Sequence, residues 1–158
     1  MERVRGRNGE TLAEHWRSHG AQAYLGTTVP GFPNAFLLAG PNTGIGHTSL
    51  VFMIEAQITY VIDAVRAAEA RSASTLEVRQ EPFEAYNDEL QKKMQKTVWN
   101  TGGCASWYLD DAGRNTTLWP DFTFKFRQRT RRFDADNYQF GAPVTPDAEP
   151  RKRVEVGS

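Results

Sequence analysis

GFPNAFLLAGPNTGIGHTS, residues Gly31–Ser49, decides the fold together with the apolar pattern that follows it to Ala68. Phe36–Ala39 (FLLA) is a short apolar block with turn-forming residues on both sides, which is the pattern of a buried strand. Gly40–Ser49 contains three glycines and a proline, so the chain must turn sharply there. The order predicted is therefore a strand, a glycine-rich turn and then a helix.

The helix is predicted to begin at Thr48 or Ser49, either of which can cap it. Its polar residues form one narrow stripe, with steps of four, four and three: Glu55, Thr59, Asp63 and Arg66. The other faces are apolar, with Leu50, Val51, Met53, Ile54, Ile58, Val61, Ile62 and Val65. A helix that is apolar around most of its circumference is buried against something large.

A strand that ends in a glycine-rich turn and leads into a buried helix is a shape that binds ligands. Glycine lets the backbone approach a ligand closely, and a helix N-terminus offers unpaired N–H groups with a partial positive charge. Together they suit an anion or the electron-rich edge of a ring. The spacing alone leaves a second interpretation open, a tight connection that binds nothing.

Two blocks of sequence carry a resemblance to a known family. Tyr24–Phe36 followed by Gly40–His47, and later Cys104–Leu109 with Gly113–Pro120, are similar to the C-terminal third of flavin-dependent monooxygenases. The resemblance is to the Baeyer–Villiger type and its flavin-containing monooxygenase relatives, and it spans about Gly9 to Tyr138. Met53–Gln57 in the predicted helix fits the same pattern.

The resemblance implies an α/β fold, the C-terminal part of a Rossmann-like FAD-binding domain. Its strand, glycine-rich turn and long buried helix would be followed by a helix, a small hairpin and a terminal helix. Residues 1–140 would form this portion, and residues 141–158 are expected to be a disordered tail rich in proline and charge.

The function implied is that of a monooxygenase that uses FAD and NADPH. Such an enzyme inserts one oxygen atom from O2 into a ketone, or oxidises a soft heteroatom. The implied cofactor-binding residues are Gly40, Pro41, Asn42, Thr43, Gly44, His47 and Leu50 near the flavin, and Trp107 near the nicotinamide nucleotide. Tyr24, Leu25 and Gly26 are implied for the substrate pocket. Tyr24 as a half-buried aromatic and His47 as a structural helix-start residue remain alternatives, and no catalytic residue or metal ligand is predicted.

The chain lacks the Gly-x-Gly-x-x-Gly fingerprints with which this family holds the pyrophosphates of FAD and NADPH. We therefore expect it to be incomplete alone and to need an N-terminal nucleotide-binding half, in the same or a separate chain. A non-catalytic remnant or a split subunit is the alternative. Without such a partner, the apolar helix is expected to cause self-association.

The composition bears on other possible functions, such as nucleic-acid binding or insertion in a membrane. The formal net charge is zero, which argues against a strongly electrostatic partner such as a nucleic acid. Basic residues do alternate with phenylalanines between Phe122 and Phe133, which keeps nucleic-acid binding as an unfavoured alternative. No apolar run approaches a membrane span, and the single cysteine, Cys104, suits the reducing cytoplasm.

Shorter elements are expected around the central stretch. In chain order they are a helix capped by Thr11, a strand over Leu76–Arg79, a helix over Glu81–Val98, a hairpin of Ser106–Leu109 with Asn115–Trp119, and a helix after Pro120. In the last segment Phe122, Phe126 and Phe133 suit one helical face, whereas the alternation of Phe122, Phe124 and Phe126 also allows a strand.

Overall fold

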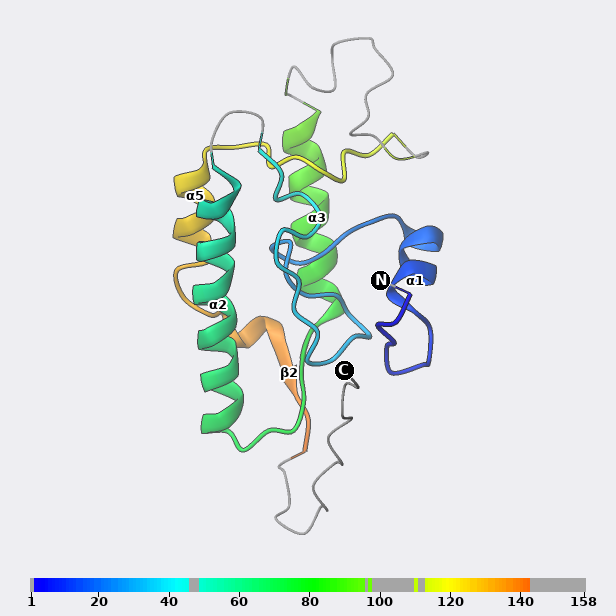
Figure 1. The fold of residues 1–158 in the computed structure, drawn as a ribbon, viewed down its shortest axis with the longest axis vertical. Coiled ribbons are helices and arrows are strands. Elements are labelled where there is room, and N and C mark those ends of the chain that lie inside the picture. The colour runs from blue at the N-terminus through cyan, green and yellow to red at the C-terminus, as the bar shows by residue number, and fades with distance from the viewer. Residues whose placement is uncertain (1, 46–48, 96, 98–109, 111–112, 143–158) are drawn as a thin grey trace, which may run out of the picture.

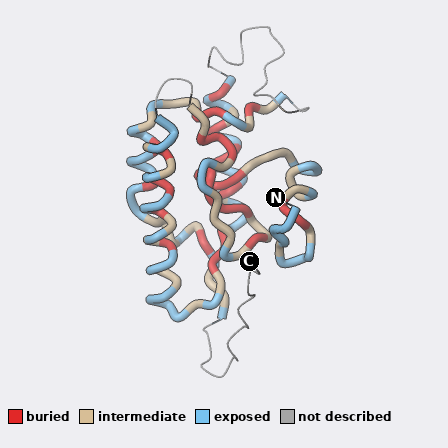
Figure 2. Tube along the Cα trace, in the orientation of Figure 1, coloured by how far each residue is buried: buried red, intermediate tan, exposed pale blue. Residues whose placement is uncertain are grey.

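The computed structural model describes residues 2–45, 49–95, 97, 110 and 113–142. Its elements are, in order, α1 (Leu12–His19), α2 (Leu50–Ala70), β1 (Leu76–Val78), α3 (Gln80–Met94), α5 (Thr123–Arg129), the 3-10 helix η1 (Ala135–Asn137) and β2 (Tyr138–Phe140). The axes of α2, α3 and α5 are roughly parallel, with α3 running in the opposite direction to α2, and α2 packs beside α5 (Figure 1). The buried residues are concentrated between α2 and α3 (Figure 2).

Helix α1 begins as its sequence predicts. The Thr11 hydroxyl accepts a hydrogen bond from the Glu14 amide at 3.2 Å, and the Glu14 carboxylate accepts one from the Thr11 amide at 2.8 Å. This reciprocal pair satisfies two amide donors that an uncapped helix leaves unpaired. The hydrogen bonds from Thr11 also lower the pKa of Glu14.

Helix α2 confirms the predicted start, with Ser49 as its N-cap. One face enters the core through Met53, Ala56, Gln57, Tyr60 and Ala64. The expectation of burial around most of the circumference is wrong within this chain. Leu50, Val51, Ile58, Ile62 and Val65 are 41% to 60% exposed. The described residues cover one side of α2 and leave a neighbouring apolar stripe without a partner.

The strand predicted over Phe36–Ala39 is absent. A strand needs a neighbouring strand to pair with its backbone, and here the segment is held by isolated contacts. The Leu37 amide donates to the Thr27 carbonyl at 2.8 Å, and the Ala39 amide donates to the Gln57 side chain at 2.9 Å. Ala39 also has a left-handed backbone, with φ of 53°, which ends any extended conformation.

The sheet of the described residues consists of β1 and β2, which pair antiparallel with Leu76 opposite Phe140 and Val78 opposite Tyr138. β1 lies where the sequence predicts a strand. Its three residues are all buried, and β2, the strand that pairs with it, was not foreseen from the sequence. The following helix is confirmed as α3, with Phe83, Tyr86, Leu90 and Met94 buried, and Val98 lies outside the described residues.

The predicted hairpin stays a prediction, because its first half, Ser106–Leu109, lies outside the described residues. Asn115–Trp119 is not a regular strand. Leu118 forms a parallel bridge with Gly44, so this segment supports the glycine-rich turn.

The segment after Pro120 is helical, as α5, and the strand alternative is wrong. Phe126 is buried, whereas Phe122 precedes the helix and is exposed, and Phe133 follows it, so the three do not share a helical face. Among the described helices, none is both long enough and apolar enough to cross a bilayer.

Two arginines of α5 stack on aromatic rings of the fold. The guanidinium of Arg127 lies 5.2 Å from the centre of the Phe52 ring, and that of Arg129 lies 5.0 Å from the Tyr86 ring. Such contacts hold cations over aromatic faces inside one molecule. They favour the interpretation of this basic-aromatic segment as packing; nucleic-acid binding itself stays an unfavoured alternative.

Candidate functional site

Most of the residues predicted around the flavin line one pocket. It has a volume of about 350 Å³ and lies where the turn after Ala39 faces the start of α2. Among its lining residues are the four turn residues Gly40, Pro41, Thr43 and Gly44, with Leu50, Trp16, Thr116 and Thr117. Five of the predicted cofactor residues therefore share one surface.

Asn42 fastens this turn to the segment after Arg114. Its side-chain amide donates to the Asn115 carbonyl at 2.6 Å and to the Leu118 carbonyl at 3.0 Å. Its backbone amide donates to Thr116, and that of Gly44 donates to Thr117. The Asn42 side chain is buried and points into the protein, so it supports the turn from behind.

The glycines of the turn are needed for contacts within the protein. A Cβ atom on Gly40 would lie 2.2 Å from the carbonyl oxygen of Gly26, and one on Gly26 would lie 2.2 Å from the Thr43 methyl group. The backbones of Gly26 and Gly40 are thus in direct contact. From the sequence, these glycines were interpreted as letting the backbone approach a ligand. In the structure, they let two loops contact each other.

Gln57 joins both loops to α2. Its side-chain oxygen accepts from the Ala39 amide at 2.9 Å, and its nitrogen donates to the Gly26 carbonyl at 2.9 Å and to the Thr27 hydroxyl at 3.0 Å. Gln57 is fully buried. Its role was missed, although a polar residue on the core face of an apolar helix was a signal for it.

The electrostatics of the pocket suit an electron-rich group. Ser49 makes no side-chain capping hydrogen bond, and the first turn of α2 contains no acidic residue. Among the described residues, the amides of Gly40 and Thr43 donate to no other protein group. Free amides and an uncapped helix N-terminus together favour a negatively charged or carbonyl-bearing ring edge. The residues present therefore fit the flavin edge that the resemblance implies.

The remaining predicted residues have different surroundings. His47 and Trp107 lie outside the described residues. Leu25 is fully buried, with a left-handed φ of 51°, and Gly26 is buried beside the turn. Tyr24 lines another pocket, of about 390 Å³, and its ring makes a T-shaped contact with the ring of Tyr86.

A cluster of polar side chains that the sequence did not reveal holds Tyr24. The Asp134 carboxylate accepts hydrogen bonds from the hydroxyls of Tyr24 and Tyr60, and from the Asn137 amide at 2.6 Å. The hydroxyl oxygens of Tyr60 and Tyr138 also lie within hydrogen-bonding distance of each other, at 3.0 Å. These partners lie up to 110 residues apart, so no local pattern could have predicted the cluster.

The tyrosines of this cluster predict a loss of stability in alkali. Burial, as the largest cause, raises the pKa values of Tyr24, Tyr60 and Tyr138 above the usual 10.0. A group whose pKa is raised on folding stabilises the protein below its unfolded pKa. We expect the free energy of unfolding in urea to fall as pH rises above about 10. Tyr60→Phe should flatten this dependence, and an equal slope in both proteins would contradict the assignment.

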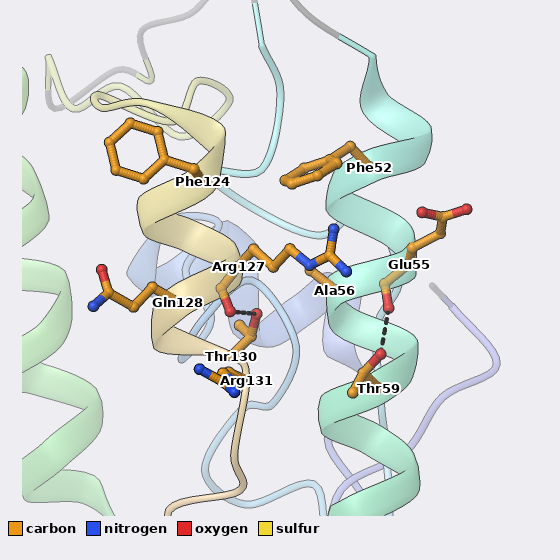
Figure 3. Close-up of a pocket in the computed structure, with 9 residues that line it drawn as sticks. All are labelled: Phe52, Glu55, Ala56, Thr59, Phe124, Arg127, Gln128, Thr130 and Arg131. Carbon is orange, nitrogen blue, oxygen red and sulfur yellow. Dashed lines mark hydrogen bonds between the residues drawn. The ribbon is translucent and has the colours of Figure 1, made fainter.

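A cavity of about 740 Å³ lies apart from these residues, between α2 and α5. Arg127 reaches across it towards Phe52, and the Thr59 hydroxyl is already bonded to the Glu55 carbonyl (Figure 3). No predicted site residue lines it. Among the described residues, no cluster of three side chains could hold a metal ion.

Known proteins match the chain over most of its length. A Baeyer–Villiger monooxygenase of Pseudomonas aeruginosa is 54% identical over 136 residues, which cover 85% of this chain and 26% of that protein. One of Streptomyces coelicolor is 48% identical over 144 residues, or 90% of this chain and 28% of that protein. The chain thus spans about a quarter of the length of these relatives. No family model matches it.

Solved structures agree with the sequence matches. A steroid monooxygenase bound to NADP superposes with a TM-score of 0.74 at 27% identity, over 86% of this chain and 26% of that one. Cyclohexanone monooxygenase from Rhodococcus sp. Phi1, bound to NADP+, gives 0.73 at 26% identity, over 87% and 26%. Over most of its length, therefore, the chain resembles the C-terminal portion of flavin-dependent monooxygenases of the Baeyer–Villiger type, which confirms the resemblance indicated by its sequence blocks.

Proposed function

We propose that this chain supplies the flavin-ring side of an FAD- and NADPH-dependent monooxygenase that inserts oxygen into ketones or oxidises soft heteroatoms. The observation that carries the proposal is the pocket at which Gly40, Pro41, Thr43 and Gly44 meet the start of α2. When bound, FAD supplies the redox chemistry that activates O2 with electrons from NADPH.

The residues of this chain would bind and orient the flavin. The free amides of Gly40 and Thr43 and the N-terminus of α2 would face the ring edge and stabilise negative charge on it. Pro41 and Leu50 would shape the apolar side of the pocket. Tyr24, Leu25 and Gly26 would border the substrate, with Tyr24 alone among them lining a described pocket. His47 and Trp107 keep their proposed cofactor roles.

The residues that bind the nucleotide part of the cofactor would lie beyond this chain. The matching residues make up only 26% of the Pseudomonas aeruginosa relative, and none of the described residues forms a fingerprint turn for pyrophosphate. The exposed apolar stripe of α2, defined by Leu50, Val51, Ile58, Ile62 and Val65, is the surface on which we place that missing half. A row of five large apolar side chains on one helix is typical of a packing surface.

The apolar stripe predicts that the chain self-associates when it is alone. We expect its apparent mass in sedimentation velocity to rise with concentration, because pairing two stripes removes apolar surface from water. Ile58→Lys should shift the equilibrium towards monomer at least about tenfold, the effect of about 1.4 kcal/mol. Thr59→Lys is the matched control, since this neighbouring exposed residue lies outside the stripe. A strictly monomeric wild-type chain would contradict the prediction.

A chimera tests the proposed function. The 136 matching residues of this chain would replace their counterparts in the Pseudomonas aeruginosa relative. We expect the isolated chain to purify colourless and the chimera to purify with the visible absorbance of oxidised flavin and to consume NADPH with a ketone. The relative without its matching quarter is the control and should not retain flavin. A folded but colourless chimera would refute the proposal.

A further inference from the structure

The loop that precedes the glycine-rich turn has little backbone structure of its own. In this loop, residues Ala23–Thr28, the backbone bonds are a bridge between Tyr24 and Thr28, short turns from Thr27 to Tyr24 and from Gly26 to Ala23, and one bond that Thr27 accepts from the Leu37 amide. Leu25 occupies the left-handed region, which costs energy for a side chain other than glycine. Side-chain contacts must therefore hold the loop in this shape.

Gln57 of α2 supplies some of those contacts, and the segment that follows α5 supplies the others. Asp134, which directly precedes η1, accepts hydrogen bonds from Tyr24 of the loop and Tyr60 of α2. Asn137 donates to both the Tyr24 hydroxyl, at 2.8 Å, and the Asp134 carboxylate. At the other end of the loop, the Thr28 hydroxyl lies 2.9 Å from the hydroxyl of Tyr138.

We propose that Asp134 is a positioning residue, whose carboxylate fixes the loop Ala23–Thr28 and, through the contact between Gly26 and Gly40, the pocket-lining turn. Hydrogen bonds to an ionised acceptor are about twice as strong as those between neutral groups. One carboxylate thereby orients two tyrosines from different parts of the chain. The backbone contact of Gly26 with Gly40 leaves no space to absorb a shift of the loop. The consequence for flavin and substrate rests on the proposed function, whereas the mechanical link does not.

Hydrogen exchange on the 158-residue chain tests the link. Asp134→Asn keeps the shape of the side chain but replaces one acceptor oxygen with a donor, so one tyrosine hydroxyl loses its partner. We expect the amides of Thr27 and Leu37 to exchange about 10- to 100-fold faster, in proportion to a lost hydrogen bond to a charged group. The amides of α3 should change less than about twofold.

Asp136→Asn is the matched control, because this residue is exposed and lies two positions away. Its exchange pattern should equal that of the unmodified chain. If Asp134→Asn unfolds the chain, Tyr24→Phe serves as the milder variant and should accelerate the same loop amides. Unchanged loop amides, or equal acceleration of loop and α3, would overturn the proposal.

A second readout separates positioning by the charge from packing alone. The negative charge of Asp134 contributes to the raised pKa values of Tyr24 and Tyr60, after burial as the largest cause. Asp134→Asn should therefore shift the appearance of tyrosinate absorbance to lower pH, and Asp136→Asn should not. An unshifted titration would contradict the role of the carboxylate. Neither measurement involves flavin, so a failed chimera and a failed loop test have distinct results.

Discussion

Gly40→Ala is expected to reduce the free energy of unfolding by at least about 2 kcal/mol, towards the upper end of the cost of overpacking. The added Cβ would lie 2.2 Å from the Gly26 carbonyl oxygen and 3.2 Å from the Leu37 Cβ. The nearest obstacle is backbone, so no rotamer change can relieve the clash. Urea unfolding followed by circular dichroism measures the loss.

Gly9→Ala separates this clash from the general cost of replacing glycine. Gly9 has a φ of +81° and nothing within 4 Å of the position of an added Cβ. We expect it to lose about 1 kcal/mol, the cost of a left-handed conformation for alanine. If Gly40→Ala were no more destabilising than Gly9→Ala, the close contact between the loops would be refuted.

Gln57→Leu is expected to cost about 3 kcal/mol or more. The substitution places an apolar side chain of similar size in the core. It leaves the Ala39 amide and the Gly26 carbonyl without their hydrogen-bond partner. Each buried polar group left unpaired costs about 1–3 kcal/mol. The same urea experiment measures it, and exchange of the Ala39 amide should accelerate more than exchange within α3.

The matched control for this substitution is Gln128→Leu. Gln128 lies on α5 and is exposed, so its replacement should change the free energy of unfolding by no more than about 0.5 kcal/mol. A small effect of Gln57→Leu, comparable to that of the control, would show that Gln57 does not hold the two loops.

The elements that the sequence predicts well are those set by local rules. The capping box of Thr11 with Glu14, the start of α2 at Ser49 and the buried residues of α3 all depend on neighbours within a few positions. Strands depend on distant partners. Phe36–Ala39 has the composition of a strand, but none of the described segments pairs with it as a strand would.

The candidate site shows the same division. Gly40, Pro41, Thr43 and Gly44 were identified by turn chemistry and by the resemblance, and the structure gathers them at one pocket. Asp134 was not identified, because its partners Tyr24 and Tyr60 are 110 and 74 residues away. Long-range contacts of this kind follow from the complete fold and leave no periodic signal in the sequence.

The central claim is that the turn at Gly40–Gly44 lies against the flavin ring. A crystal structure of the flavin-loaded chimera measures this most directly. We expect backbone atoms of Gly40 and Thr43 to lie within hydrogen-bonding distance, about 3 Å, of polar atoms on the isoalloxazine edge. A chimera that binds flavin with this turn far from the ring would contradict the account.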